Sequence, residues 1–132
     1  MPPSAAEVVE QLRSDRRLGP LIVDSLFLPA VPVRTGRLDP PLPLPLRQAL
    51  VGAGTEHLWS HQVEGLTAVR AGQDVLVTTP TASGKSLVFH LPVLEEAHAE
   101  GPGRALFLYP LKALGQDQKA KFDALAKAAG LA

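Results

Sequence analysis

The residues best suited to chemistry form one run, Thr79-Pro80-Thr81-Ala82-Ser83-Gly84-Lys85-Ser86. A short apolar run precedes it, and an apolar-periodic stretch begins at Leu87. A strand, a loop of small residues and a helix in this order make a phosphate cradle, because the loop N–H groups and the helix N-terminus direct partial positive charge at one spot. Lys85 supplies an ammonium for the outer phosphates, and the Ser86 hydroxyl is suited to Mg²⁺. The run predicts a site for ATP and Mg²⁺.

The match to the general phosphate-loop pattern G-x-x-x-x-G-K-[ST] is incomplete. Gly84, Lys85 and Ser86 fit the pattern, but Thr79 stands where the first glycine would be. A lone Gly-Lys-Ser is also compatible with a surface turn. The apolar run before the loop and the helical periodicity after it favour nucleotide binding.

The elements around the loop predict an α/β fold. The run 75–79 reads as a strand, and the following helix carries Leu87, Val88, Leu91 and Leu94 at helical spacing, with Pro92 expected to kink it. Residues 105–109 are continuously apolar, as in a strand covered on both faces. A last helix is expected over 111–128. We therefore predict a parallel, right-handed βαβ unit that places Thr79 and Tyr109 at the ligand-binding rim of a sheet.

The region before residue 53 reads as a separate extension. Ser4 and Glu7 fit a capping box that starts a short helix, and residues 21–28 are predicted to form a strand. Residues 29–45 are rich in proline, which predicts an extended arm with buried leucines; a ligand for a proline-reading domain is the alternative. One or two helical turns are expected over 46–51, and Ser60 is expected to cap a helix over 61–70. Two domains are predicted. Residues 1–52 form a proline-rich and partly helical extension, and residues 53–132 form the domain that carries the phosphate loop.

Composition excludes several classes of protein. The formal net charge is zero, so nucleic-acid or membrane binding would need a local patch. There is no cysteine, which excludes disulfides and thiolate metal sites, and the histidines at 57, 61, 90 and 98 have no metal-ligand rhythm. No apolar run is long enough to span a membrane, and no signal peptide is evident. A cytoplasmic location without a membrane partner is expected.

The three motifs together resemble superfamily 2 helicases of the DEAD/DEAH-box group. The loop Thr79–Ser86 is similar to their motif I, in which a small residue replaces the first glycine. Leu58–Gln62 resembles the upstream motif whose glutamine reads adenine, so Gln62 would pair with the base; Trp59 would stack on it or be a buried structural residue. Tyr109–Leu114 resembles motif Ia, which implies that Pro110, Leu111 and Lys112 contact nucleic acid; the resemblance favours DNA over RNA, although the sequence itself does not distinguish them.

The residues of the three motifs most resemble those of the bacterial YprA/MrfA-type helicases linked to DNA repair. This resemblance extends from about residue 21 onward. Two positions depart from the pattern. Ala82 replaces a common glycine, which is tolerable if its φ is negative, and Leu111 replaces a threonine that would contact phosphate. Other residues have plain interpretations: His61 is expected to be solvated, and Lys119, Lys121 and Lys127 to form a solvated face with Asp117 and Asp123.

The resemblance implies a RecA-like P-loop NTPase domain that continues beyond this sequence. Hydrolysis needs an acidic residue on Mg²⁺ and, in this group, a second RecA-like domain, and neither follows Tyr109 here. We therefore expect the N-terminal part of an ATP-dependent helicase, whose partners include the missing C-terminal helicase domains, with little or no turnover by this chain alone. The alternatives are a non-catalytic interaction fragment with a vestigial loop and another class of P-loop NTPase.

Overall fold

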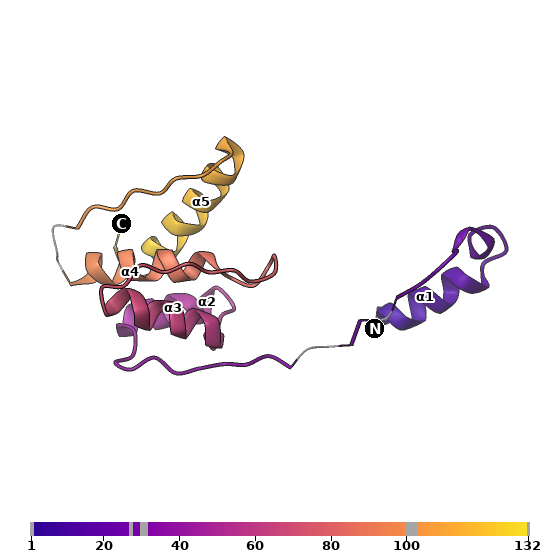
Figure 1. The fold of residues 1–132 in the computed structure, drawn as a ribbon, viewed down its shortest axis with the longest axis horizontal. Coiled ribbons are helices and arrows are strands. Elements are labelled where there is room, and N and C mark those ends of the chain that lie inside the picture. Colours follow the sequence, from indigo (N-terminus) through magenta and orange to yellow (C-terminus); the bar gives the residue numbers. More distant parts are fainter. Residues whose placement is uncertain (1, 27, 30–31, 100–102, 132) are drawn as a thin grey trace. The chain divides into compact units, whose positions relative to one another are not determined.

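The computed structural model describes residues 2–26, 28–29, 32–99 and 103–131. The chain divides into two compact units, Met1–Pro32 and Val33–Ala132, which are described separately (Figure 1). The predicted boundary between residues 52 and 53 stays a prediction. The helix α2 (Leu44–Gly52) belongs to the same compact unit as the phosphate loop.

The first unit contains the helix α1 (Ala5–Ser14) and a 3-10 turn, η1 (Gly19–Leu21). The predicted capping box is confirmed, because the Glu7 N–H donates to Ser4 Oγ at 3.3 Å and the Ser4 N–H donates to Glu7 Oε2 at 2.6 Å. The strand predicted over 21–28 is wrong for its described residues. The segment opens in η1 and then leaves Val23 99% and Leu26 82% exposed, and none of the described residues forms a strand that pairs with it. Residue 27 lies outside the described residues.

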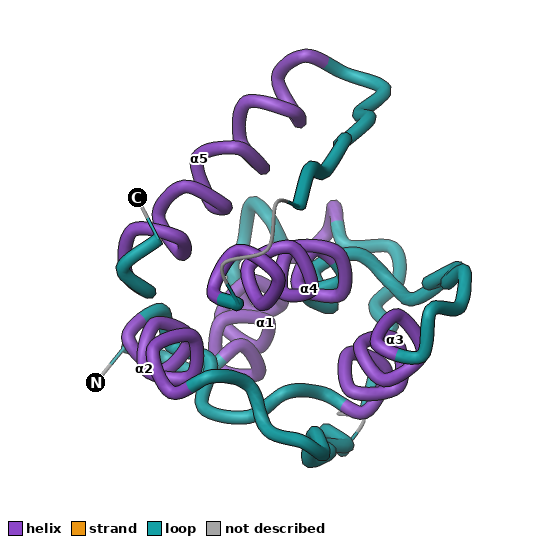
Figure 2. The backbone as a smooth tube through the Cα atoms, turned by 90° about the vertical axis from the view of Figure 1, so that its left-hand side faces the viewer, coloured by secondary structure: helices purple, strands orange, loops and turns teal. Residues whose placement is uncertain are grey.

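The described residues of the second unit form four α-helices around one leucine-rich core. These helices are α2, α3 (Ser60–Arg70), α4 (Ser86–His98) and α5 (Lys112–Ala128). α3 packs on α4, and α5 packs on both α2 and α4 (Figure 2). Four leucines supply its most deeply buried side chains, and burial of each is worth about 1.5–3 kcal/mol; they are Leu46, Leu66, Leu91 and Leu94.

The proline-rich arm leads into α2 and lies along the start of α3. Leu42 is buried in the core, as the arm interpretation predicts, whereas Leu44 is 55% exposed. α2 begins at Leu44, two residues earlier than expected, because Pro45 suits the first turn of a helix. Upstream, the Ser60 N–H donates to the Arg34 carbonyl at 2.8 Å and the Gly36 N–H donates to the Leu58 carbonyl at 3.1 Å. These two bonds fix the entry into α3, whose N-cap is Trp59 rather than Ser60.

An ion pair ties the arm to two helices. Arg70 Nη2 at the end of α3 lies 2.5 Å from Glu95 Oε1 on α4, and both side chains are largely buried. Arg70 Nη1 also donates to the Pro40 carbonyl at 2.5 Å. The α3–α4 pair and the arm are thereby joined at one arginine.

The predicted βαβ unit is not formed. Residues 75–79 and 105–109 run as irregular segments, and the part of the chain that the structure describes contains no strand (Figure 2). Leu76, Leu106 and Leu108 are 89%, 83% and 83% exposed. A strand gains its hydrogen bonds and its buried faces only from neighbours, so two apolar segments cannot form a parallel sheet alone. The described residues are mainly helical, so the βαβ part of the predicted α/β fold is not seen in them.

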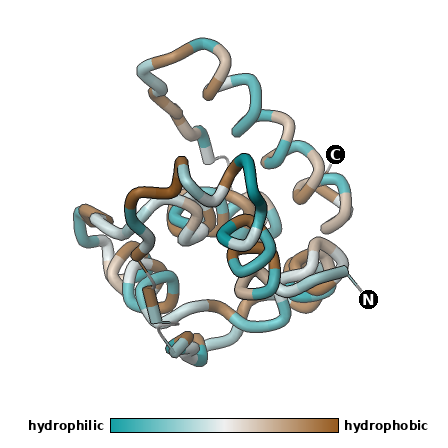
Figure 3. The backbone as a smooth tube through the Cα atoms, turned by 90° about the vertical axis from the view of Figure 1, so that its right-hand side faces the viewer, coloured by the Kyte–Doolittle hydropathy of each residue, from teal (hydrophilic) through white to brown (hydrophobic). Residues whose placement is uncertain are grey.

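The last helix is amphipathic. α5 alternates between hydrophilic and hydrophobic residues along its turns (Figure 3). Leu125 and Phe122 face the core, whereas the lysines and aspartates lie outside. No helix in the described ranges is both long enough and apolar enough to cross a membrane.

Candidate functional site

The phosphate loop closes on itself around Lys85. Its ammonium donates to the carbonyls of Thr79 and Pro80, each at 2.6 Å, and lies 3.5 Å from Ser83 Oγ. Thr79 Oγ1 and Ser83 Oγ share a hydrogen bond of 2.5 Å across the base of the loop. The residue in place of the first glycine therefore contributes a side-chain bond that glycine could not make.

Ala82 adopts a left-handed backbone conformation. Its φ is +61°, so the condition of a negative φ, on which an alanine would be tolerable here, is not met. A left-handed residue other than glycine brings Cβ close to the following carbonyl, at a cost of roughly 1–2 kcal/mol. Gly84 also has a positive φ, +68°, at no such cost. The loop thus has one strained position and one that suits its residue.

The start of α4 offers free N–H groups at the end of the loop. In the part of the chain that the structure describes, the N–H groups of Gly84, Lys85 and Ser86 have no hydrogen-bond acceptor. The first intrahelical bonds are those from Leu87 to the Gly84 carbonyl at 3.2 Å and from Val88 to the Lys85 carbonyl at 3.0 Å. Three successive free donors at a helix N-terminus are suited to an anion such as phosphate.

Gln62 joins the first turn of α3 to this loop. Its side chain is 3% exposed. Gln62 Oε1 accepts from the Trp59 N–H at 2.9 Å, and Gln62 Nε2 donates to the Gly84 carbonyl at 2.9 Å. A carboxamide has two donor protons and two acceptor lone pairs, so one of each remains for a ligand. The predicted adenine reader is thus held rigidly against the predicted phosphate cradle.

A small cavity of about 250 Å³ opens beside Gln62. We call it the Gln62 cavity. Its walls come from the loop before α3, from α3 itself and from the phosphate loop: Gly54, Thr55, Glu56, His57, Trp59, Gln62, Ala82, Gly84 and Leu87. Trp59 is half-exposed at its edge. The structure therefore brings both predicted adenine contacts together with two residues of the phosphate loop.

The contact of His61 with the phosphate loop was not predicted from the sequence, which led us to expect a solvated side chain. Its Nε2 lies 2.9 Å from the Ser83 carbonyl oxygen, and its ring packs edge-to-face on Trp59 with ring centroids 5.6 Å apart. The prediction for His61 is wrong, because the first turn of α3 points the ring at the loop. The available signal was its position next to Gln62 at a helix start.

A wider cleft of about 890 Å³ lies on the other side of the loop. Its walls are Thr81–Ser86, Phe89, Leu106–Tyr109, Leu114, Gln118 and Lys121. The predicted nucleic-acid residues Pro110, Leu111 and Lys112 follow directly at the start of α5, where all three are exposed. Tyr109 and Leu114, the two ends of the motif Ia segment, therefore share a cleft with the phosphate loop, whereas the three residues predicted to contact nucleic acid do not line it.

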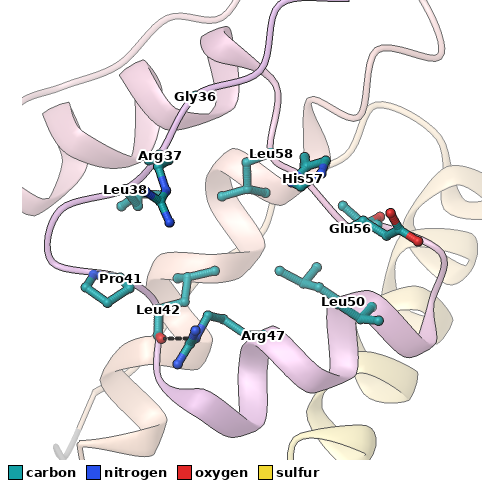
Figure 4. A pocket seen from close by; sticks show the side chains of 12 residues that line it. Gly36, Arg37, Leu38, Pro41, Leu42, Arg47, Leu50, Glu56, His57 and Leu58 are labelled. Carbon is teal, nitrogen blue, oxygen red and sulfur yellow. Dashed lines mark hydrogen bonds between the residues drawn. The ribbon is translucent and has the colours of Figure 1, made fainter.

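Another cavity, of about 320 Å³, lies between the proline-rich arm and α2 (Figure 4). Leu42, Leu50 and Leu58 line it, and Arg47 stands at its edge, where Nε donates to the Leu42 carbonyl at 3.1 Å. It shares Thr55–His57 with the Gln62 cavity. The same short loop thus walls two cavities, and none of the predicted site residues lies in this one.

The lysines of α5 behave largely as expected. Lys121 Nζ lies 2.7 Å from Asp117 Oδ2, and Lys119 pairs with Asp123 one turn apart. The hydrogen bond from Lys121 is the main reason that the pKa of the Asp117 carboxyl lies below its ordinary value. These exposed pairs confirm the solvated face, although Lys121 also reaches the wider cleft.

His90 is a histidine whose environment the sequence did not predict. It is buried among the rings of Phe89, Phe107 and Phe122, and its Nε2 has no hydrogen-bond partner among the described residues. Burial first, and the positive charge of Lys121 second, lower the pKa of His90. Both effects favour the neutral ring, which packs as part of the aromatic cluster.

Comparison with known proteins places these residues in a family. The model of the DEAD/DEAH box helicase family matches residues 59–132. The chain is 38% identical over 86 residues to the uncharacterized ATP-dependent helicase YprA of Bacillus subtilis (strain 168), a match that covers 65% of this chain. It is 33% identical over 119 residues to the ATP-dependent helicase hrq1 of Schizosaccharomyces pombe, over 88% of this chain.

A solved structure shares the fold. The DUF1998 helicase MrfA bound to DNA and AMPPNP matches 97% of this chain with a TM-score of 0.77 and 28% identity. The match covers 17% of that chain, and this chain spans 12% and 11% of the YprA and hrq1 relatives. The matched part thus corresponds to a small share of each longer protein.

Proposed function

The chain belongs to the DEAD/DEAH box helicase family, and from that premise we propose that its second unit binds ATP with Mg²⁺ as the N-terminal part of a DNA helicase. One observation carries the proposal: Gln62 Nε2 donates to the Gly84 carbonyl, which joins the predicted adenine reader to the predicted phosphate cradle. A surface turn with the same Gly-Lys-Ser residues would have no reason to be held by a buried glutamine. The relatives named helicases support the same conclusion.

The roles follow from the contacts. Gln62 and Trp59 take the adenine in the Gln62 cavity, with the remaining amide donor and acceptor of Gln62 directed at the base edge. The loop Thr79–Ser86 holds the triphosphate through its free N–H groups. The Ser86 hydroxyl, first in α4, is the group suited to Mg²⁺, which would neutralise charge on the outer phosphates. Thr81, Ala82 and Ser83 shape the loop rather than supply charge.

Lys85 must change partners when a triphosphate binds. In the structure its ammonium is held by two carbonyls of the loop. A phosphate oxygen carries a full charge and competes for the ammonium with a stronger, charge-assisted hydrogen bond. We therefore expect the Lys85 side chain to leave the loop carbonyls for the β and γ phosphates.

The nucleic-acid contact is proposed for Pro110, Leu111 and Lys112. Their exposure at the start of α5 leaves the backbone N–H groups and the Lys112 ammonium accessible to a phosphodiester. The MrfA relative is described as bound to DNA, which favours DNA over RNA here. Residues 75–79 and 105–109 would become parallel strands of a RecA-like sheet once neighbouring strands are present, which would cover Leu76, Leu106 and Leu108.

The test is titration of the 132-residue chain with a fluorescent ATP analogue and Mg²⁺. Lys85→Ala removes the outer-phosphate contact and should weaken binding at least about tenfold, as expected for loss of a charged contact of ~1.5–3 kcal/mol. Lys127→Ala, an exposed lysine at the end of α5, is the matched control and should leave binding unchanged. Equal affinity for the Lys85→Ala variant and the parent would refute the nucleotide site.

The same titration separates the interaction-fragment alternative. A vestigial loop predicts no binding of the analogue by the parent chain. Turnover is a separate question, because no Asp-Glu pair follows the loop in the printed sequence. We expect ATP binding by this chain without appreciable phosphate release, and phosphate release that depends on Lys85 would contradict that expectation.

A further inference from the structure

We propose that His61 is a positioning residue for the phosphate loop, which acts with Gln62 as a two-point clamp on successive carbonyls. This inference rests on the proposed nucleotide site but concerns a residue without an assigned role. Two neighbouring side chains at the start of α3 reach the two neighbouring carbonyls of the loop. His61 Nε2 contacts the Ser83 oxygen and Gln62 Nε2 contacts the Gly84 oxygen, both at 2.9 Å.

The direction of the His61 bond is fixed by chemistry. A carbonyl oxygen can only accept a hydrogen bond, so the ring nitrogen that faces Ser83 must carry the proton. The ring is steadied by Trp59, on which it packs edge-to-face with centroids 5.6 Å apart. α3 in turn is held close to α4, since a Cβ atom at Gly65 would lie 2.6 Å from Val88 Cγ1. The donor is thus mounted on a rigid pair of helices.

The consequence for the loop follows from peptide geometry. In a planar trans peptide the C=O and the next N–H point in opposite directions. When His61 holds the Ser83 carbonyl on one side, the Gly84 N–H is directed to the other side. The Gln62 bond does the same for the Lys85 N–H. These are two of the donors that have no acceptor in the described part of the chain.

The clamp also explains why the glycine of Gly-Lys-Ser cannot be replaced here. A Cβ atom at Gly84 would lie 2.5 Å from Gln62 Nε2, so any side chain would push the clamp away. The hydrogen bond of His61 acts on the phosphate loop, whereas its ring touches the base site only through Trp59. Loss of His61 should therefore weaken ATP binding more than adenosine binding.

The experiment compares ATP with adenosine as probes for the parent chain and three variants. His61→Ala removes the donor and should weaken ATP binding roughly two- to tenfold, the effect of one lost hydrogen bond, and should weaken adenosine binding less. His61→Gln places an amide donor near the same point and should restore ATP affinity. His98→Ala, an exposed histidine at the end of α4, is the control and should bind both probes as the parent does.

Three results would overturn the clamp. These are unchanged ATP affinity for His61→Ala, equal weakening of ATP and adenosine, and no recovery with His61→Gln. Equal weakening would mean that His61 supports the fold or the base pocket rather than the phosphate loop.

A measurement without nucleotide keeps the clamp testable even if the parent does not bind ATP. In amide NMR spectra, His61→Ala should shift the resonances of Gly84 and Lys85, His61→Gln should return them toward the parent, and His98→Ala should leave them in place. Unshifted resonances in His61→Ala would refute the clamp whatever the fate of the nucleotide proposal. ATP binding that fails in the parent, with shifted resonances, would refute the nucleotide proposal and leave the clamp standing.

Discussion

The two sides of the phosphate loop differ in how they are held. On the α3–α4 side, buried leucines, the Arg70–Glu95 pair and the two bonds to successive loop carbonyls fix every element. On the other side, residues 75–79 and 105–109 leave three leucines largely exposed. The difference shows that the α3–α4 pair and the loop bound to it can form a site from their own contacts. The two segments predicted as strands need neighbouring strands before they can become regular.

Core truncation gives the largest expected contrast between the two sides. Leu91 on α4 is fully buried, so Leu91→Ala should lower the free energy of unfolding by about 2–5 kcal/mol. Leu106→Ala removes the same atoms from an exposed position and should change it by less than about 0.5 kcal/mol. Urea denaturation followed by circular dichroism measures both. A similar loss for the two variants would mean that residues 105–109 are packed in solution.

Relief of strain at Ala82 gives a smaller effect of opposite sign. Glycine accepts the φ of +61° without a clash, so Ala82→Gly should stabilise the second unit by about 1 kcal/mol. The matched control is Ala124→Gly on the exposed face of α5. This change should destabilise the second unit by roughly 0.5–1 kcal/mol, because glycine loses more conformational freedom than alanine when the helix forms. Destabilisation by both variants would contradict a left-handed Ala82.

The pH dependence of the aromatic cluster is the smallest effect and has a defined sign. Burial lowers the pKa of His90 below its ordinary value of 6.5, so the unfolded chain takes up a proton before the folded chain does. The contribution of His90 to the free energy of unfolding should therefore be fully present above pH 6.5 and decline as the pH falls below it. His90→Leu should flatten this decline, while His98→Ala should not. Thermal unfolding across that pH range is the measurement, and an unchanged slope in His90→Leu would exclude His90 as the cause.

Local patterns sufficed for much of the fold and for the outline of the site. Helical periodicity predicted α3, α4 and α5 to within a few residues, because each buries one apolar stripe. The capping box at Ser4 was likewise a short-range signal. The prediction of strands failed because formation of a sheet depends on residues far away in the sequence. The loop motif and Gln62 were recognisable by residue type and order.

What the sequence could not supply was orientation. The role of His61 depends on where the first turn of α3 faces, and the strain at Ala82 depends on a single backbone angle. Strands over 75–79 and 105–109 were predicted from apolar runs alone, which do not say whether a neighbouring strand is present; both segments are irregular in the structure. The structure therefore adds the direction of side chains such as His61 and the sign of the φ angle at Ala82.

The most direct test of the central claim is a map of amide shifts on titration of the parent chain with ATP and Mg²⁺. The account predicts that the largest changes fall on Gly84, Lys85 and Ser86, with a second group over Trp59–Gln62, and that residues of the first unit do not respond. Changes confined to other parts of the chain, or none at saturating ATP, would contradict a nucleotide site built from α3 and the phosphate loop.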